Sequence, residues 1–282
     1  MNIGAYKLFA IEAGTFWLDG GAMFGIIPKV LWEKMNIPDD RNRVQLATRC
    51  LLIVGNGRTI LVDTGNGAKC TDKFRSIYSY DDTTNNLMGS LQQICISRAD
   101  ITDVILSHLH FDHVGGSTIK ENGAFIPAFP NATYYVQRTQ WDTALNPTER
   151  DRASFIPGDY LPLQHHGVLK MLEGEIELFP GIDILLSNGH TAGLQMVKIS
   201  DGTKTLFYPA DLIPFMSHIS LPYIMGFDLR PLVTLEDKRK YFSRAVDENW
   251  MILFEHDPSI VLGTVKKTEK GFAFGTSVEM KQ

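Results

Sequence analysis

The chain has 282 residues, of which 44% are hydrophobic and 21% are charged, so it is long enough to bury a sizeable core and is not disordered by composition. Its formal net charge of -5 gives no general attraction to phosphate backbones or anionic lipid, which argues against a nucleic-acid partner. The three cysteines, Cys50, Cys70 and Cys95, form no CxxC pair, so a thiolate zinc site is not expected.

The N-terminal segment lacks the pattern of a signal peptide, and no apolar run reaches the roughly 18 residues of a spanning helix. Three widely spaced cysteines do not suggest a disulfide framework, which is consistent with reduced thiols and a reducing compartment. We therefore expect a soluble, cytoplasmic protein with no membrane segment.

The first third of the chain reads mainly as strands. Short β-prone runs at 6–9 and 15–18 come first. Two β-branched runs then flank Gly55-Asn56-Gly57, which predicts a hairpin whose second strand covers 59–62. Apolar residues at helical spacing predict a helix over 87–96.

Helices and strands alternate in the rest of the chain. A strand over 132–137 and a helix over 138–145 precede residues 148–173, which are rich in Pro and Gly and read as a surface excursion or lid. Further strands are expected at 182–187, 195–199, 205–208 and 251–254. Between the last two lie an irregular apolar loop, 213–233, and a helix with Thr234 as its N-cap. No linker or repeat interrupts this pattern, so we expect a single domain over 1–282.

The strongest chemical signal follows an apolar strand expected at 103–107. Starting at residue 107 the chain reads SHLHFDHVGG, which places three histidines and one aspartate within six positions. The candidate ligands are His108, His110, Asp112 and His113. Strand alternation would place the first two on one face, and a turn permitted by Gly115 and Gly116 would bring in the others. Imidazole and carboxylate suit zinc, iron or manganese, and four such ligands in one loop indicate two metals.

This HxHxDH pattern resembles the signature of the metallo-β-lactamase superfamily. The family pattern continues with a histidine, an aspartate and a last histidine at strand ends, and the chain offers His190, Asp211 and His256 in that order. Asp63 in the segment VDTG matches the early aspartate of the family. The match runs over roughly 45–260. It implies an α/β fold, a four-layer αβ/βα sandwich of two mixed β-sheets packed face to face with helices outside.

The resemblance also implies a dinuclear metal site. One ion is expected to bind His108, His110 and His190, the other Asp112, His113 and His256, with Asp211 bridging both. Two ions ~3.5–4 Å apart lower the pKa of a shared water towards ~7, which supplies a hydroxide nucleophile without a protein nucleophile. Zinc is the expected metal, although iron, manganese or cobalt would accept the same ligands.

Two carboxylates are expected to act in catalysis beyond simple ligation. Asp63 is expected to accept a hydrogen bond from a ligand histidine and so fix its tautomer. Asp112 is expected to take part in proton transfer as well as to bind metal.

Individual residues weigh against several branches of the superfamily. The commonest β-lactamases carry a cysteine ligand where this chain has Asp211, and flavodiiron proteins carry a glutamate where it has His110. The segment DGGAMFGIIPK, residues 19–29, together with HLHFDH, resembles the YtnP-type quorum-quenching lactonases, whose close relatives are methyl-parathion-type organophosphorus hydrolases.

The expected function is therefore the opening of acyl-homoserine-type lactones. A flexible apolar strip at 20–25 would place Met23 and Phe24 against an acyl chain or an aromatic leaving group, and His218 would line the pocket. The alternatives are a glyoxalase-II-like thioesterase, an organophosphorus or aryl ester hydrolase on the same metals, and a metal-binding sensor without turnover. The apolar N-terminal strip also makes a homodimer possible.

Overall fold

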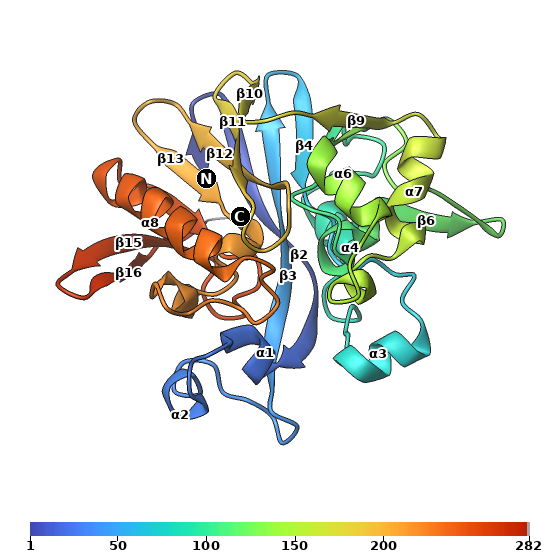
Figure 1. Cartoon of the computed structure of the whole chain (residues 1–282). Coiled ribbons are helices and arrows are strands. Elements are labelled where there is room, and N and C mark those ends of the chain that lie inside the picture. The colour runs from blue at the N-terminus through green and yellow to red at the C-terminus, as the bar shows by residue number, and fades with distance from the viewer. Residues whose placement is uncertain (281–282) are drawn as a thin grey trace. The chain divides into compact units, whose positions relative to one another are not determined.

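The computed structural model describes residues 1–280, which cluster into two compact units. Of the described residues, the first unit contains 1–15 and 48–174, and the second contains 16–47 and 175–280. The chain forms two seven-stranded mixed β-sheets with helices (Figure 1). The first sheet belongs to the first unit except for the parts of β2 and β3 within 16–47, and the second sheet belongs to the second unit. The expected α/β class with two mixed sheets is thereby confirmed, whereas a single domain over 1–282 stays a prediction.

The sheet of the first unit has the strand order β1-β2-β3-β4-β5-β8-β9. Its strands are β1 (Asn2–Ile3), β2 (Tyr6–Asp19), β3 (Arg43–Gly55), β4 (Arg58–Val62), β5 (Asp103–Ile105), β8 (Thr133–Gln137) and β9 (Leu169–Leu172). β3 and β4 form the predicted antiparallel hairpin, in which Asn56 and Gly57 both have positive φ, as a two-residue turn requires. From β4 to β9 the strands pair in parallel, so their carboxyl ends lie at one edge of the sheet.

Helices cover the sheet of the first unit and fill its core. They are α3 (Asp72–Tyr78), α4 (Leu87–Gln93), α5 (Phe111–Val114), α6 (Arg138–Leu145) and α7 (Pro157–His165), with the turns η1 (Gly115–Ser117) and η2 (Arg152–Ser154) and the small hairpin of β6 (Thr118–Glu121) and β7 (Ala124–Pro127). Leu91, Trp141 and Leu163, one from each of α4, α6 and α7, lie in one buried cluster with Val104 and Tyr134 of the sheet. Burial of each such side chain contributes ~1.5–3 kcal/mol, so these helices are fixed by packing.

The sheet of the second unit has the order β10-β11-β12-β13-β14-β15-β16. Its strands are β10 (Ile176–Phe179), β11 (Ile182–Ser187), β12 (Leu194–Ser200), β13 (Thr205–Tyr208), β14 (Met251–Leu253), β15 (Leu262–Thr268) and β16 (Gly271–Ser277). The unit also contains α1 (Gly20–Phe24), α2 (Lys29–Trp32), α8 (Pro231–Asp247) and the turns η3 (Ala210–Leu212) and η4 (Met216–Ile219). Tyr241, Phe242 and Ala245 of α8, the long orange helix in Figure 1, pack on Phe207 and Ile252 of the sheet.

Several elements differ from the sequence prediction for identifiable reasons. The runs expected at 6–9 and 15–18 belong to one strand, β2, in which Gly14 at φ 122° interrupts the side-chain alternation. Residues 148–173 are not a lid, because α7 and β9 belong to the packed core and sheet of the first unit. Helix α8 begins at Pro231, so Thr234 lies inside its first turn and is not its N-cap.

None of the helices in residues 1–280 combines the length and the apolar character that a bilayer-crossing helix needs.

Candidate metal centre

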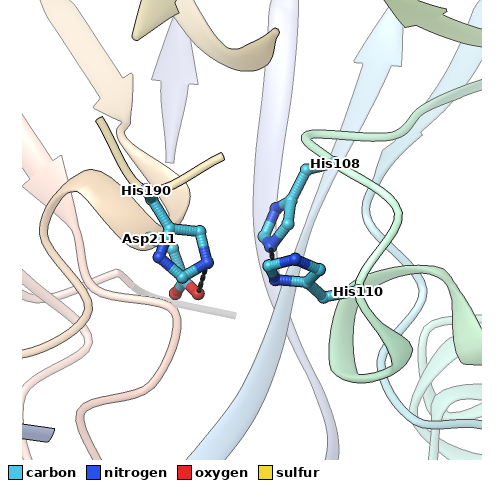
Figure 2. Close-up of side chains that lie close together, drawn as sticks. All are labelled: His108, His110, His190 and Asp211. Atoms are coloured by element: carbon cyan, nitrogen blue, oxygen red, sulfur yellow. Dashed lines mark hydrogen bonds and ion pairs between the residues drawn. The ribbon is translucent and has the colours of Figure 1, made fainter. Parts of the chain in front are cut away.

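The HxHxDH motif lies immediately beyond the end of β5. The strand ends at Ile105, His108 lies in the following loop, His110 is the N-cap of α5, and Asp112 and His113 lie on that helix. Strand alternation therefore plays no part in placing the histidines, contrary to the sequence expectation. The loop still brings Nε2 of His108 to 3.0 Å from Nδ1 of His110 (Figure 2), and all four candidate ligands are buried.

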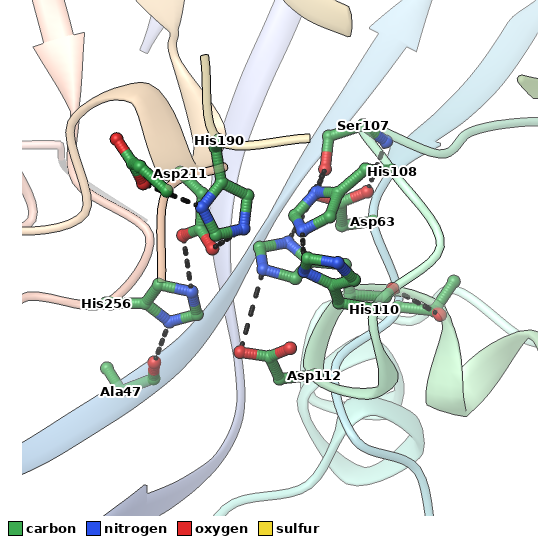
Figure 3. A network of polar contacts seen from close by, with 12 residues as sticks. Ala47, Asp63, Ser107, His108, His110, Asp112, His190, Asp211 and His256 are labelled. Atoms are coloured by element: carbon green, nitrogen blue, oxygen red, sulfur yellow. Dashed lines mark hydrogen bonds and ion pairs between the residues drawn. The ribbon is translucent and has the colours of Figure 1, made fainter. Parts of the chain in front are cut away.

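Asp63 holds this loop from the end of β4. It adopts a left-handed conformation at φ 57°, and its carboxylate accepts hydrogen bonds from both the backbone N–H and the hydroxyl of Ser107, each at 2.6 Å (Figure 3). The same carboxylate lies 3.1 Å from Nδ1 of His113, so the expected hydrogen bond to a candidate ligand is present. A carboxylate on Nδ1 selects the tautomer in which Nε2 can bind a metal. A role of Asp63 in catalysis stays a prediction.

The glycine pair after the motif allows two backbones to pack closely. The backbone N–H and the hydroxyl of Thr64 donate to the carbonyl of His113 at 2.7 and 2.9 Å. A Cβ on Gly115 would lie 2.2 Å from the carbonyl oxygen of Asn66, and one on Gly116 would lie 2.2 Å from that of Thr64. Gly115 itself is in the ordinary helical region at φ -57°, so the need for glycine is close approach and not the sharp turn that the sequence suggested.

The Gly116→Ala variant is expected to unfold at a lower urea concentration, with a loss of ~2–3 kcal/mol, because its Cβ would collide with backbone that cannot move aside. Gly89→Ala in α4 is the matched control, since its Cβ would meet only the Asn86 side chain at 3.2 Å and alanine favours the helix. Equal midpoints for both variants would contradict the close-packing explanation.

The candidate ligands of the second unit converge on Asp211. This residue follows β13 in η3, directly after Ala210, whose left-handed φ of 46° turns the chain sharply at the strand end. Oδ2 of Asp211 lies 3.1 Å from Nε2 of His190, and Oδ1 lies 3.1 Å from Nε2 of His256 (Figures 2 and 3). One carboxylate oxygen thus faces each imidazole, so Asp211 offers a separate donor atom beside each of the two histidines.

The opposite nitrogen of each of these imidazoles has a partner. Nδ1 of His256 lies 2.8 Å from the carbonyl oxygen of Ala47. Because a carbonyl can only accept, Nδ1 carries the hydrogen, and Nε2 of the neutral ring is left with a lone pair for a metal. Nδ1 of His190 lies 3.0 Å from Oδ1 of Asp228. Histidines that bind metals are characteristically held in this way by a carbonyl or carboxylate. The chemistry of these side chains therefore fits a divalent metal ion.

Two residues near the candidate ligands had no signal in the sequence. Asp228 lies in the proline-rich loop 213–233, where no motif marks it. Phe155, from the segment expected to be a lid, places its ring 4.8 Å from that of His110 in an edge-on contact. Both contacts join side chains distant in sequence, so spacing alone does not reveal them.

The residues expected to bind substrate lie in an aromatic cluster of the second unit. Met23 and Phe24 are fully buried on α1, whose N-terminus is capped by Asp19, so the expectation of a flexible strip is wrong. The Phe24 ring stacks on Trp32 at 4.9 Å and on His218 at 5.1 Å. Nε2 of His218 donates to the carbonyl of Met23, and burial lowers the pKa of His218 to about 3, which keeps the ring neutral. Contact of these three side chains with a substrate stays a prediction.

Comparisons with known proteins agree with these observations. The model of the metallo-β-lactamase superfamily matches residues 43–256. N-acyl homoserine lactonase AiiA of Bacillus thuringiensis subsp. kurstaki is 28% identical over 266 residues, which cover 89% of this chain and 93% of that protein.

Two solved structures resemble the whole chain. A probable metal-dependent hydrolase from Staphylococcus aureus has a TM-score of 0.90 at 25% identity, covering 100% of this chain and 99% of its own. AidC, a dizinc quorum-quenching lactonase in complex with its product, has a TM-score of 0.83 at 25% identity, covering 100% and 97%. Because the family model spans most of the sequence, the chain belongs to the metallo-β-lactamase superfamily and is one of its metal-dependent hydrolases.

Proposed function

We propose that the protein opens the ring of N-acyl homoserine lactones. The observation that carries this proposal is the carboxylate of Asp211 with one oxygen at Nε2 of His190 and the other at Nε2 of His256, a donor set suited to hydrolysis with a pair of metal ions. The likeness to AiiA over 89% of the chain favours a lactone among the possible esters.

The proposed metals are two divalent ions, with zinc as the preferred metal. The proposed ligands are His108, His110, Asp112, His113, His190, Asp211 and His256. Such a pair of ions, when bound, polarises the carbonyl oxygen and makes water a stronger nucleophile at neutral pH. AidC, which carries two zinc ions, supports this choice of metal.

The residues of the chain would orient the ligands and move the proton. Asp63 fixes the tautomer of His113 through its contact with Nδ1. The carboxylate of Asp112 lies 3.6 Å from Nε2 of His113. We assign to Asp112 the transfer of one proton from the attacking water to the ring oxygen, which becomes a hydroxyl when the C–O bond of the lactone breaks. Addition of one water across that bond gives the ring-opened hydroxy acid, which ionises and releases one proton.

The acyl chain is assigned to the aromatic cluster of Met23, Phe24 and His218. What supports this assignment is the apolar character of the cluster and the neutral imidazole, which is less costly to desolvate than an imidazolium. Because Met23, Phe24 and His218 are buried, the packing around them would have to open to admit an acyl chain. The homodimer stays a prediction, and the apolar side chains that it would cover include Ile26, which is 90% exposed, and Ile37, which is 83% exposed.

The proposal predicts rapid proton release when zinc-loaded protein is mixed with acyl-homoserine lactones of increasing chain length. The His108→Ala variant is expected to lose this release by at least ~1,000-fold, because loss of a buried ligand removes several kcal/mol of charge stabilisation. His165→Ala is the matched control, since His165 ends α7 at the exposed surface. Turnover of S-lactoylglutathione or an aryl phosphotriester without any lactone would replace the lactonase assignment. Silence on every ester class from protein that holds two metals would instead favour a binding role.

A further inference from the structure

Asp228 connects a candidate metal ligand to helix α8. Its side chain is buried, with Oδ1 at 3.0 Å from Nδ1 of His190 and Oδ2 accepting a 2.6 Å hydrogen bond from the hydroxyl of Thr234. The backbone is tied at the same place, because the N–H of Leu229 donates to the carbonyl of His190 and that of Arg230 donates to the carbonyl of Gly189. Both the ring and the backbone of His190 are therefore held by one short segment.

Gly189 makes this arrangement sterically possible. A Cβ at that position would lie 2.1 Å from the Thr234 hydroxyl and 2.6 Å from the Thr234 backbone nitrogen. The glycine that precedes the histidine in GHTAG thus leaves the space that the threonine occupies. Sequence alone had assigned Thr234 to capping the helix, but its hydroxyl serves the carboxylate of Asp228 instead.

Lys238 fixes the other part of the same loop. It lies one helical turn after Thr234 on α8, and its fully buried side-chain nitrogen lies 2.8, 3.1 and 2.8 Å from the carbonyl oxygens of Ser220, Leu221 and Tyr223. Residues four apart lie on the same face of a helix, so Thr234 and Lys238 bind the loop that carries Asp228 at two points along α8. The position of the carboxylate is therefore set by the helix and not by a mobile loop.

We propose that Asp228, held by Thr234, is a positioning residue that orients His190 and selects the tautomer in which its Nε2 binds metal. If Asp228 only tied the loop to α8, the hydrogen bond from the Thr234 hydroxyl to one of its oxygens would be enough. The other oxygen instead faces Nδ1 of the His190 imidazole. A charged acceptor there keeps the proton on Nδ1 and makes Nε2 a stronger electron-pair donor to a cation. The inference rests on the metal site of the proposed function and is independent of which ester is hydrolysed.

The test measures zinc affinity by competition with a chromophoric chelator, and the visible spectrum of the cobalt-loaded protein. Asp228→Asn, which keeps the shape but removes the charge, is expected to weaken one of two metal equivalents by ~10–100-fold and to change the cobalt spectrum. Thr234→Val is expected to act in the same direction with a smaller effect, and Thr234→Ser to restore the parent affinity. Since Thr234→Val replaces the hydroxyl with a methyl group of similar size, it still tests the inference if Asp228→Asn fails to fold.

Asp151→Asn is the matched control. Asp151 is also buried and also accepts a threonine hydroxyl, that of Thr148 at 2.5 Å, but it belongs to the segment before α7 in the first unit. Its variant is expected to keep parental metal affinity and an unchanged spectrum. Affinities within twofold of the parent for both Asp228→Asn and Thr234→Val would overturn the inference. Because the test measures metal affinity, its outcome does not depend on whether the protein hydrolyses lactones, and failure of one proposal can be distinguished from failure of the other.

Discussion

The Asp211→Asn variant is expected to lose hydrolytic activity by at least ~1,000-fold and to bind less than two equivalents of metal. Each oxygen of the Asp211 carboxylate faces one imidazole at 3.1 Å, and an asparagine side chain keeps only one oxygen and carries no charge. As the proposed bridging ligand, Asp211 would then lose half of its donor atoms and would no longer hold two cations in place. A factor of 1,000 corresponds to about 4 kcal/mol of lost transition-state stabilisation, within the range for loss of a metal-held electrostatic contact.

Metal content by mass spectrometry and proton release from lactone would be measured on the same preparations. Asp183→Asn provides the matched control, because Asp183 is a partly exposed carboxylate paired with Lys198 on the neighbouring strand of the same unit. That variant is expected to keep both metals and full activity. An Asp211→Asn protein with two metals and parental activity would show that the carboxylate is not a bridging ligand.

The candidate ligands divide into those that local sequence reveals and those that it does not. His108, His110, Asp112 and His113 were predicted from six consecutive positions, because a short loop necessarily keeps its own side chains close together. The candidate ligands His190, Asp211 and His256 were predicted only from the order of a family pattern. Each follows a strand closely, but many residues do so, and nothing in their immediate neighbours distinguishes them.

The supporting contacts were beyond sequence reasoning for a physical reason. The His190–Asp228 contact joins residues 38 positions apart, and the Asp63–His113 contact joins residues 50 apart. Only the fold determines such distances. Asp63 was predicted because the family pattern includes it, whereas Asp228 lies in a loop whose prolines indicate irregular backbone and nothing more.

One structural error was avoidable from the residues themselves. The sequence predicts a flexible segment from Gly20 to Gly25, yet Asp19 precedes it and accepts a 2.8 Å hydrogen bond from the N–H of Ala22. Aspartate is among the preferred helix N-caps, so the short helix α1 had a local signal. The burial of Phe24 had none, because it depends on the rings of Trp32, Phe215 and His218 packing around it.

The stability that Lys238 confers is expected to rise with pH. Burial lowers the pKa of Lys238 from 10.5 to about 7, against a smaller opposing effect of the Asp228 charge. Between these two values the unfolded chain carries a proton on this amine that the folded chain does not, so unfolding becomes less favourable as pH increases. The slope from one such group is at most ~1.4 kcal/mol per pH unit, and the cost of burying the ammonium is fully present below about pH 7.

The difference in unfolding free energy between the parent and Lys238→Met isolates this effect, because the other titrating groups are common to both proteins. In urea unfolding at about pH 7, 8 and 9, the unfolding free energy of the parent is expected to rise relative to that of the variant by ~1 kcal/mol or more per pH unit. At every pH the variant also leaves the carbonyls of Ser220, Leu221 and Tyr223 without their buried donor, at ~1–3 kcal/mol each. Lys240→Met, at an exposed position of the same helix, is expected to show a constant difference across this range. Parallel pH curves for the parent and Lys238→Met would mean that the buried amine keeps its proton over this range. The three carbonyls would then stabilise a fully charged ammonium in the interior of the second unit.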